Sequence, residues 1–344
     1  MGKILYGVMG DSGGHLSRSL AIARQLEGHE ILFVGGGRVG EVTRHGYQLV
    51  KAPMLGTEVR GGRVDVTATV LNGLRLALQR GAITERLAGV IDAFDPDLIV
   101  TDYEYFLPLA ARKRGRPCIS VDRQHVLTNC VYSSPPGHRF SALLTKGVIR
   151  ATHMRASRYL ISSFAPMQPV DAETTEIFPP VLRREVEGLS PAAGGHGLVY
   201  LYGIAPARLR QLLGGRARRF IIYGHDLERE EGNLSFRRHS VDGFLADLAG
   251  ADYVISHGGH NLISEALHLG KPLLCCPIAL EYEQYFNAHL LQAAGYGAAG
   301  DIRRGGAMVD DFEAALPGMA RAAAAYRPWG QGTIAARLEQ LISG

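Results

Sequence analysis

Short apolar runs of β-prone residues alternate with helical periodicities along the chain, and this alternation restricts the fold more than any other feature. In the first half, strands are expected at 4–8, 30–34, 98–101, 118–121 and 159–162. In the second half, they are expected at 198–202, 219–223, 253–256 and 273–276. Strand, helix and strand in this order indicate parallel sheets with right-handed crossovers. The sequence therefore predicts an α/β protein with two doubly wound, Rossmann-like units.

Length and composition place a boundary between the two units. A chain of 344 residues has room for two domains of ordinary size. The stretch 165–196 holds five prolines and a Gly-Gly pair near its end, which is typical of a linker. We expect an N-terminal domain at 1–164, this linker, a C-terminal domain at 197–325 and a closing helical segment at 326–344. Two such domains are expected to face each other across a cleft.

The start of the sequence and the cysteines indicate where in the cell the protein is expected. The first residues lack the charged, apolar and small-residue regions of a secretory signal. The sequence contains no run of about 18 apolar residues without charge, so no transmembrane helix is expected. The four cysteines have no Cys-x-x-Cys spacing, so reduced and buried thiols are expected. We therefore expect a cytoplasmic protein, with attachment to the inner face of the membrane as an open alternative.

Charge is distributed unevenly along the chain. The formal net charge is +4, yet the segment 123–170 contains six Lys and Arg residues and no Asp or Glu. Such a basic surface attracts phosphate groups on an acceptor, a lipid or a nucleic acid, although solvated basic faces are also common. Aromatic residues do not interleave with these charges, so nucleic acid is not an expected partner.

The same segment carries an apolar stripe at helical spacing. Its members are Phe140, Leu143, Leu144, Gly147, Val148 and Ala151. The basic residues Arg139, Lys146 and Arg150 fall together on an adjacent face. This pattern predicts a helix that either lies on an anionic membrane surface or packs inside the N-terminal domain.

The first glycine-rich loop, at 10–15, follows the first expected strand and opens the first helix. Gly13 and Gly14 let the backbone approach a ligand, and helix amides at this position bind negative groups. The spacing is not the Gly-x-Gly-x-x-Gly dinucleotide fingerprint. His15 is the candidate general base, because imidazole titrates near neutral pH and takes a proton from a hydroxyl. Asp11 is an alternative base, and a histidine that only forms a hydrogen bond is the simpler alternative.

The next candidate, Asp102, directly follows the strand at 98–101 and therefore shares a sheet edge with His15. A carboxylate at this place holds an imidazole in one tautomer and stabilises the imidazolium. We choose Asp102 over the neighbouring Glu104. The Asp-x-Asp pattern at 95–97 precedes a strand and is typical of a turn, so no metal site is expected.

The most specific motif lies between 257 and 284. A strand ends at Ser256, and two glycines permit a tight turn into a helix whose amides and dipole hold a pyrophosphate. His257 and Asn261 add side-chain donors. Glu265 reaches the two hydroxyls of a ribose, to which a carboxylate bonds bidentately. Two side chains that follow the next strand suit sugar hydroxyls, namely Glu283 and Gln284.

These residues carry a resemblance to a known family. The motif from 257 to 284 resembles the His-x-Gly-x-Asn, Glu, Gly-x-Pro and Asp/Glu-Gln signature of UDP-sugar transferases with the two-domain GT-B architecture. The runs 284–288 and 13–15 resemble segments of the bacterial lipid-linked N-acetylglucosaminyltransferases, which belong to glycosyltransferase family 28. Leu262 departs from the serine of the plant-type signature. The loop before Glu283 is two residues longer than in those enzymes, which makes Glu281 an alternative to Glu283.

The resemblance implies an acceptor-binding N-terminal domain, to which 326–344 returns, and a donor-binding C-terminal domain. The implied donor contacts are Gly203, His257, Gly258, Gly259 and Asn261 for the diphosphate, Glu265 for the ribose, Val241 and Phe244 for the base, and Glu283 and Gln284 for the sugar. On the acceptor side it implies His15 as the base, next to Gly13, Gly14 and Asp11. The resemblance implies no metal or other cofactor, because a helix dipole and hydrogen-bond donors stabilise the leaving diphosphate.

We therefore expect a metal-independent, inverting glycosyltransferase that moves a hexose or N-acetylhexosamine from a UDP-sugar to an acceptor hydroxyl. The acceptor is expected to be a small molecule or an anionic or lipid-linked one. Two alternatives stay open: a UDP-sugar 2-epimerase, which shares the architecture, and a non-catalytic sugar-nucleotide-binding subunit. The pair of His15 and Asp102 argues against the second, because a binding protein needs no base.

Overall fold

The computed structural model describes residues 1–11, 13–54, 59–60, 63–64, 66–153, 155–330 and 332–343. These residues form two compact units. The first unit comprises Met1–Tyr132, Leu144–Arg183 and Trp329–Gly344, and the second comprises Ser133–Leu143 and Arg184–Pro328. Ser12, in the glycine-rich loop of the sequence analysis, lies outside the described residues.

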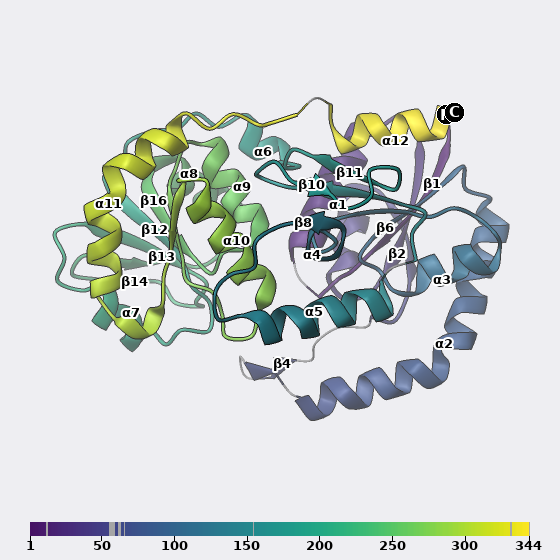
Figure 1. The fold of residues 1–344 in the computed structure, drawn as a ribbon, viewed down its shortest axis with the longest axis horizontal. Helices are drawn as coiled ribbons and strands as arrows, with labels where there is room; N and C mark the ends of the chain where they lie inside the picture. Colours follow the sequence, from purple (N-terminus) through teal and green to yellow (C-terminus); the bar gives the residue numbers. More distant parts are fainter. Residues whose placement is uncertain are drawn as a thin grey trace. The chain divides into compact units, whose positions relative to one another are not determined.

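The first unit is built on a seven-stranded sheet in which all neighbouring strands are parallel (Figure 1). Its order is β11-β9-β7-β6-β1-β2-β3. The strands are β1 (Lys3–Val8), β2 (Glu30–Gly35), β3 (Gln48–Lys51), β6 (Leu98–Asp102), β7 (Ile119–Asp122), β9 (Arg158–Ser162) and β11 (Thr175–Phe178). The chain runs outward from β1 to β3 and then resumes on the other side of β1 with β6. This reversal between β1 and β6 is where doubly wound sheets bind ligands.

Helices cover both faces of this sheet, which explains why β1 reads as a continuous apolar run. Side chains of Ile4 and Tyr6 belong to an apolar cluster with α1 (Gly13–Gln25) and α12 (Ile334–Ser343). Leu5 points to the opposite face and joins a cluster with α2 (Val66–Phe94) and α3 (Phe106–Lys113). The remaining elements include η1 (Gly37–His45) and α4 (Val126–Asn129), with the short strands β4 (Val59–Arg60), β5 (Arg63–Val64), β8 (Cys130–Val131) and β10 (Gln168–Pro169). Helix α5 (Arg139–Thr152) is divided between the units, because 139–143 belongs to the second and 144–152 to the first.

The second unit repeats this arrangement with the order β14-β15-β13-β12-β16-β17-β18. Its strands are β12 (His196–Tyr200), β13 (Arg219–Tyr223), β14 (Arg229–Glu231), β15 (Leu234–Phe236), β16 (Ala251–Ser256), β17 (Leu273–Cys275) and β18 (Gly297–Ala299). All pairs are parallel except the edge pair of β14 and β15. The order reverses between β12 and β16, which marks the ligand-binding edge of this unit.

The helices of the second unit are α6 (Arg184–Glu187), α7 (Pro206–Leu213), α8 (Val241–Gly250), α9 (His260–His268), α10 (Tyr282–Ala293), η2 (Ile302–Arg304) and α11 (Ala307–Ala324). An apolar cluster joins Val199 and Ile255 of the central strands to Leu209 of α7 and Phe312 of α11. The strands expected from the sequence are all present, and the α/β architecture with two doubly wound units is confirmed.

The stretch 165–196, expected as a linker, is largely part of the first unit. Strand β11 pairs with β9 at the edge of the first sheet. The β-prone run of β11 forms a strand because the prolines flank it: Pro179 and Pro180 follow its last residue, where no further ladder donor is needed. At the end of the chain, α12 packs against α1, and the Trp329 indole donates a hydrogen bond to the Ser163 carbonyl at 3.0 Å. The chain passes from the first unit to the second after Arg183 and returns after Pro328, and Ser133–Leu143 also belongs to the second unit.

Candidate active site

The two side chains predicted as base and orienting acid meet in the first unit. His15 lies in the first turn of α1, and Asp102 is the last residue of β6. The imidazole Nδ1 of His15 is 2.6 Å from the Asp102 carboxylate, and both side chains are buried. This hydrogen bond spans the point at which the strand order reverses, because α1 follows β1 and β6 is its neighbour.

Two residues that the sequence analysis did not select complete the surroundings of Asp102. The Arg18 guanidinium donates two hydrogen bonds to this carboxylate, with Nε at 2.9 Å and Nη2 at 2.6 Å. The Ser19 hydroxyl donates a third at 3.0 Å. With the His15 contact, both oxygens of Asp102 are engaged, so the carboxylate is held in a fixed orientation.

The proton affinity of His15 follows from this environment. Burial disfavours the imidazolium, but the charge and the hydrogen bond of Asp102 together outweigh burial, so the pKa of His15 is raised above its ordinary value. The Asp102 contact is made by Nδ1, which leaves Nε2 as the nitrogen available for proton transfer. The Gln124 amide lies 3.4 Å from this Nε2.

The loop residues before His15 are placed differently from one another. Asp11 is exposed, whereas the His15 side chain is buried. Gly13 and Gly14 are half-buried and form the start of α1. A side chain at Gly13 would come within 3.0 Å of the Arg38 guanidinium. The geometry therefore favours His15 over Asp11 as the group that accepts a proton.

Two further acidic groups lie at the same edge of the first sheet. Glu104 is buried, accepts a hydrogen bond from the Leu107 amide at 2.5 Å, and has a pKa that burial raises to about 7. Asp122, at the end of β7, pairs with His125 at 2.5 Å, and both side chains are buried. Tyr103, next to Glu104 in sequence, has a left-handed φ of 59°. Its ring contacts His125 and stacks on His153. A strained backbone of this kind is often found at functional sites.

In the second unit, His257 has a different environment from the one predicted. Its Nδ1 lies 2.8 Å from the Cys276 carbonyl oxygen, and its Nε2 lies 2.9 Å from the Tyr202 carbonyl oxygen. Both ring nitrogens are therefore engaged by backbone acceptors, and the ring is buried. The prediction that this side chain donates to a diphosphate is not supported by the geometry. Instead, the imidazole fixes the loops after β12, β16 and β17.

The turn that follows His257 has the predicted form. Gly258 adopts a left-handed φ of 90°, which a side chain would strain, and its carbonyl accepts a hydrogen bond from Asn287 at 3.0 Å. Gly259 is exposed and precedes α9, and no described side chain caps this helix. The first amides of α9 are therefore oriented to bind an anion.

The remaining predicted donor contacts differ in exposure. Asn261 in the first turn of α9 is half-buried, whereas Glu265 one turn later is buried. Glu281 is exposed at the start of α10, and Glu283 is half-buried in its first turn. The Gln284 side chain accepts a hydrogen bond from the Ile278 amide at 2.9 Å. Gln284 therefore also holds the loop that precedes it.

The residues predicted for the base lie at the start of α8. Val241 is exposed, and the Ser240 hydroxyl caps the helix by accepting from the Gly243 amide at 3.2 Å. Phe244 is buried against Tyr223, with ring centroids 5.2 Å apart. The Phe244 side chain thus packs α8 against the end of β13. Gly203, in the turn after β12, has a left-handed φ of 76° and is exposed.

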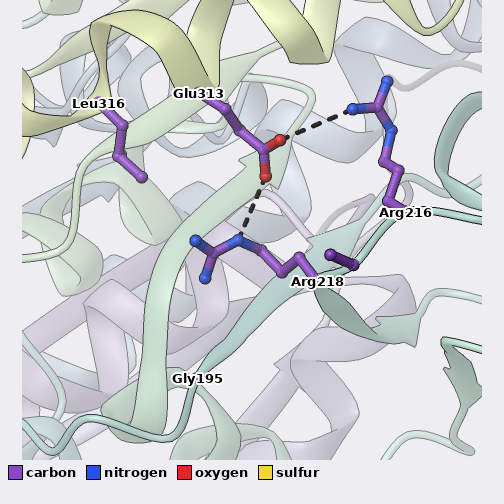
Figure 2. Close-up of a pocket in the computed structure, with 6 residues that line it drawn as sticks. Gly195, Arg216, Arg218, Glu313 and Leu316 are labelled. Atoms are coloured by element: carbon purple, nitrogen blue, oxygen red, sulfur yellow. Dashed lines mark hydrogen bonds and ion pairs between the residues drawn. The ribbon is translucent and has the colours of Figure 1, made fainter.

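An open depression of about 590 Å³ lies at the opposite, amino-terminal edge of the second sheet. Figure 2 shows Glu313 in this depression between Arg216 and Arg218, at 3.6 and 3.2 Å. Arg216 also pairs with Asp310 at 2.6 Å, and Arg218 pairs with Asp252. Because acidic partners already neutralise both arginines, this depression is not an anion site.

Among the described residues, no group of three or more His, Cys, Asp or Glu side chains is arranged to hold a metal ion. The helices in the described ranges include none that is long and apolar enough to cross a membrane.

Comparisons with known proteins agree with this architecture. The family model described as glycosyl transferase family 1 matches residues 2–317. The chain belongs to this glycosyltransferase family. Among curated proteins, it is 25% identical to an uncharacterized glycosyltransferase of Methanosarcina acetivorans over 325 residues, which cover 86% of this chain and 84% of that protein.

A second relative of this glycosyltransferase is the UDP-N-acetylglucosamine--N-acetylmuramyl-(pentapeptide) pyrophosphoryl-undecaprenol N-acetylglucosamine transferase of Lawsonia intracellularis. It is 26% identical over 83% of this chain and 80% of its own length. Among solved structures, spinosyn forosaminyltransferase has a TM-score of 0.68 at 18% identity and full coverage of both chains. The fold is therefore that of the GT-B glycosyltransferases, and the matches do not favour the epimerase or the non-catalytic alternative.

Proposed function

We propose that this glycosyltransferase transfers a hexose or N-acetylhexosamine from a UDP-sugar to an acceptor hydroxyl, with inversion at the anomeric carbon and without a metal ion. The observation that carries the proposal is the buried pair of His15 and Asp102 at the point where the first sheet reverses its strand order. Such a pair suits removal of a proton from a hydroxyl.

The acceptor reacts in a single displacement. As its oxygen attacks the anomeric carbon, its proton passes to Nε2 of His15, while Nδ1 keeps its hydrogen bond to Asp102. The bond from the anomeric carbon to the β-phosphate oxygen breaks, and its electron pair leaves with UDP. One displacement inverts the anomeric configuration. Asp102 stabilises the imidazolium that forms.

The second unit supplies the donor contacts in this proposal. The uncapped first turn of α9 and its dipole stabilise the departing diphosphate, with Gly258, Gly259 and Asn261 at the turn. Glu265 binds the ribose hydroxyls, and Glu283 the sugar. This assignment is supported by the relative from Lawsonia intracellularis, whose name includes a UDP-N-acetylglucosamine donor.

The acceptor is proposed to be anionic or lipid-linked, and helix α5 is the support for this choice. The apolar stripe named above is exposed along its whole length, and Phe140 is 72% exposed. The opposite face of α5 buries Ala142 and Ile149. This exposure supports the membrane-facing alternative over packing inside the N-terminal domain. With Arg139 and Arg150 beside it and no acidic residue nearby in sequence, the stripe suits an anionic membrane surface.

Calorimetric titration without divalent metal tests the donor assignment. UDP and UDP-N-acetylglucosamine are expected to bind, whereas NAD and dTDP are expected to bind weakly or not at all. Glu265→Ala should weaken UDP binding about 10-fold or more, because charged hydrogen bonds to two hydroxyls are lost. Asp311→Ala, an exposed acid of the same unit, is the control. Binding of NAD alone, or equal UDP affinity in both variants, would contradict the proposal.

A further inference from the structure

The contact between Arg18 and Asp102 is a buried ion pair with two hydrogen bonds. The exposed fractions of the two side chains are 4% and 0%. The contact joins one turn of α1 to the end of β6, across 84 positions of sequence. Arg18 also approaches His15, with Nη2 at 3.2 Å from Nδ1. A single carboxylate therefore lies between two groups that both present N–H donors to it.

Charge balance separates the roles of these two donors. A buried carboxylate needs a positive partner, because its desolvation is otherwise strongly unfavourable. The guanidinium is always protonated and supplies this charge without using His15. Asp102 raises the pKa of His15 and Arg18 opposes this rise, so the guanidinium favours the neutral imidazole, which donates only its Nδ1–H to Asp102. A general base must start in this neutral form.

Other groups near the pair do not change this balance. The groups that face His15 are Asp102, Arg18, Asp11, Gln124 and Tyr103. Those that face Asp102 or Arg18 are Ser19 of α1, Tyr6 of β1 and Asp122 of β7. Tyr6 is neutral, since burial raises its pKa above the ordinary value. Asp122 is already paired with His125, and Asp11 is exposed.

We propose that Arg18 is a positioning residue that supplies the countercharge of Asp102, so that His15 enters the reaction as a neutral base. This inference rests on the proposed role of His15. Without Arg18, the buried carboxylate would recruit a proton to His15 for its countercharge. The imidazolium would persist at neutral pH, and the enzyme would lose its base.

The experiment combines a titration of His15 with a pH–rate profile. Histidines labelled with ¹³C are titrated by NMR in the full-length protein, and the His15 signal is assigned by its loss in His15→Gln. Arg18→Met should raise the titration midpoint of His15 by about one pH unit or more, because a nearby positive charge is removed. The acid limb of kcat/KM should move by the same amount. Arg24→Met, on the same helix, is the matched control and should leave both unchanged.

Arg18→Lys separates charge from orientation. Lysine keeps the positive charge but cannot form the two-point contact, so the His15 midpoint should stay near the wild-type value while kcat falls about 10-fold. If Arg18→Met does not fold, Arg18→Lys still tests whether the two-point contact of Arg18 with Asp102 matters for kcat. If Arg18 were merely structural, its replacement would lower the activity equally at all pH values and would leave the titration midpoint of His15 unchanged.

The results have separate meanings for the two proposals. An unchanged His15 midpoint in Arg18→Met would overturn the role of Arg18, and so would a His15 midpoint in Arg18→Lys that rises as far as in Arg18→Met. A shifted midpoint in a protein that transfers no sugar would support the countercharge and reject the transferase assignment. The NMR readout does not depend on turnover, so the two failures are distinguishable.

Discussion

Nε2 of His257 lies 2.9 Å from the carbonyl oxygen of Tyr202 and thereby joins the loops after β16 and β12, the two strands at which the second sheet reverses its order. His15 joins the equivalent strands of the first unit through Asp102. The two histidines differ in what their second nitrogen contacts. His257 is bound by a carbonyl on each side, whereas His15 binds its carboxylate through Nδ1 and has only the more distant Gln124 amide at Nε2. The first arrangement fixes loops, and the second suits proton transfer.

His257→Ala should destabilise the protein by about 2 kcal/mol, because the imidazole contacts to the carbonyl groups of Cys276 and Tyr202 are lost. Denaturant unfolding without ligand measures this loss. His268→Ala, a half-buried histidine at the end of the same α9, is the control. Unchanged stability together with weaker UDP binding would show instead that the imidazole contacts the ligand.

Asp102→Asn should lower kcat by about 10²–10⁴-fold, because the amide no longer fixes the His15 tautomer or stabilises the imidazolium. His15→Ala should lower kcat to a similar extent. Initial rates at saturating donor measure both effects, and Asp92→Asn, an exposed acid of the first unit, is the control. Nearly full activity in His15→Ala would reject this histidine as the base.

The stability of the protein should depend on the ionisation of Glu104. Burial raises its pKa from 4.5 to about 7, so the folded state favours the protonated carboxyl. The stabilisation by this group is complete below about pH 4.5 and is lost as the pH rises to about 7. Glu104→Gln should remove this dependence and raise the unfolding free energy at pH 8 by up to about 3 kcal/mol.

Unfolding free energies at pH 5 and pH 8 measure the Glu104 effect. Glu85→Gln, at an exposed ion pair of the same unit, should not reproduce it. Equal pH dependence in wild type and Glu104→Gln would show that Glu104 is ionised in the folded protein.

Helix α5 should bind vesicles that contain about 30% phosphatidylglycerol and should not bind neutral phosphatidylcholine vesicles, because both its apolar stripe and its basic residues contribute. Leu144→Ser with Val148→Ser should reduce co-sedimentation about 10-fold. Leu78→Ser, at an exposed leucine of α2, is the control. Equal sedimentation of the wild type and the α5 variant would assign this face to another partner.

The strands that carry the candidate site were predictable because their local signals are strong. Parallel strands covered on both faces read as apolar runs, and the loops after them hold glycines next to polar residues. These signals placed His15 and Asp102 at one sheet edge. Strand β11 was missed because the prolines around it outweighed its short β-prone run.

Sequence by itself determined the two doubly wound units, the edge at which ligands bind, and the residues His15, Asp102 and Glu265 as candidates. Only the tertiary structure decided which groups each of these side chains contacts. Arg18 occupies an ordinary position on an amphipathic helix, and its partner is 84 residues away. The partners of His257 are backbone carbonyls, which no residue type encodes. Local periodicity specifies elements, whereas the charge of a buried group is set by neighbours that meet only when the chain has folded.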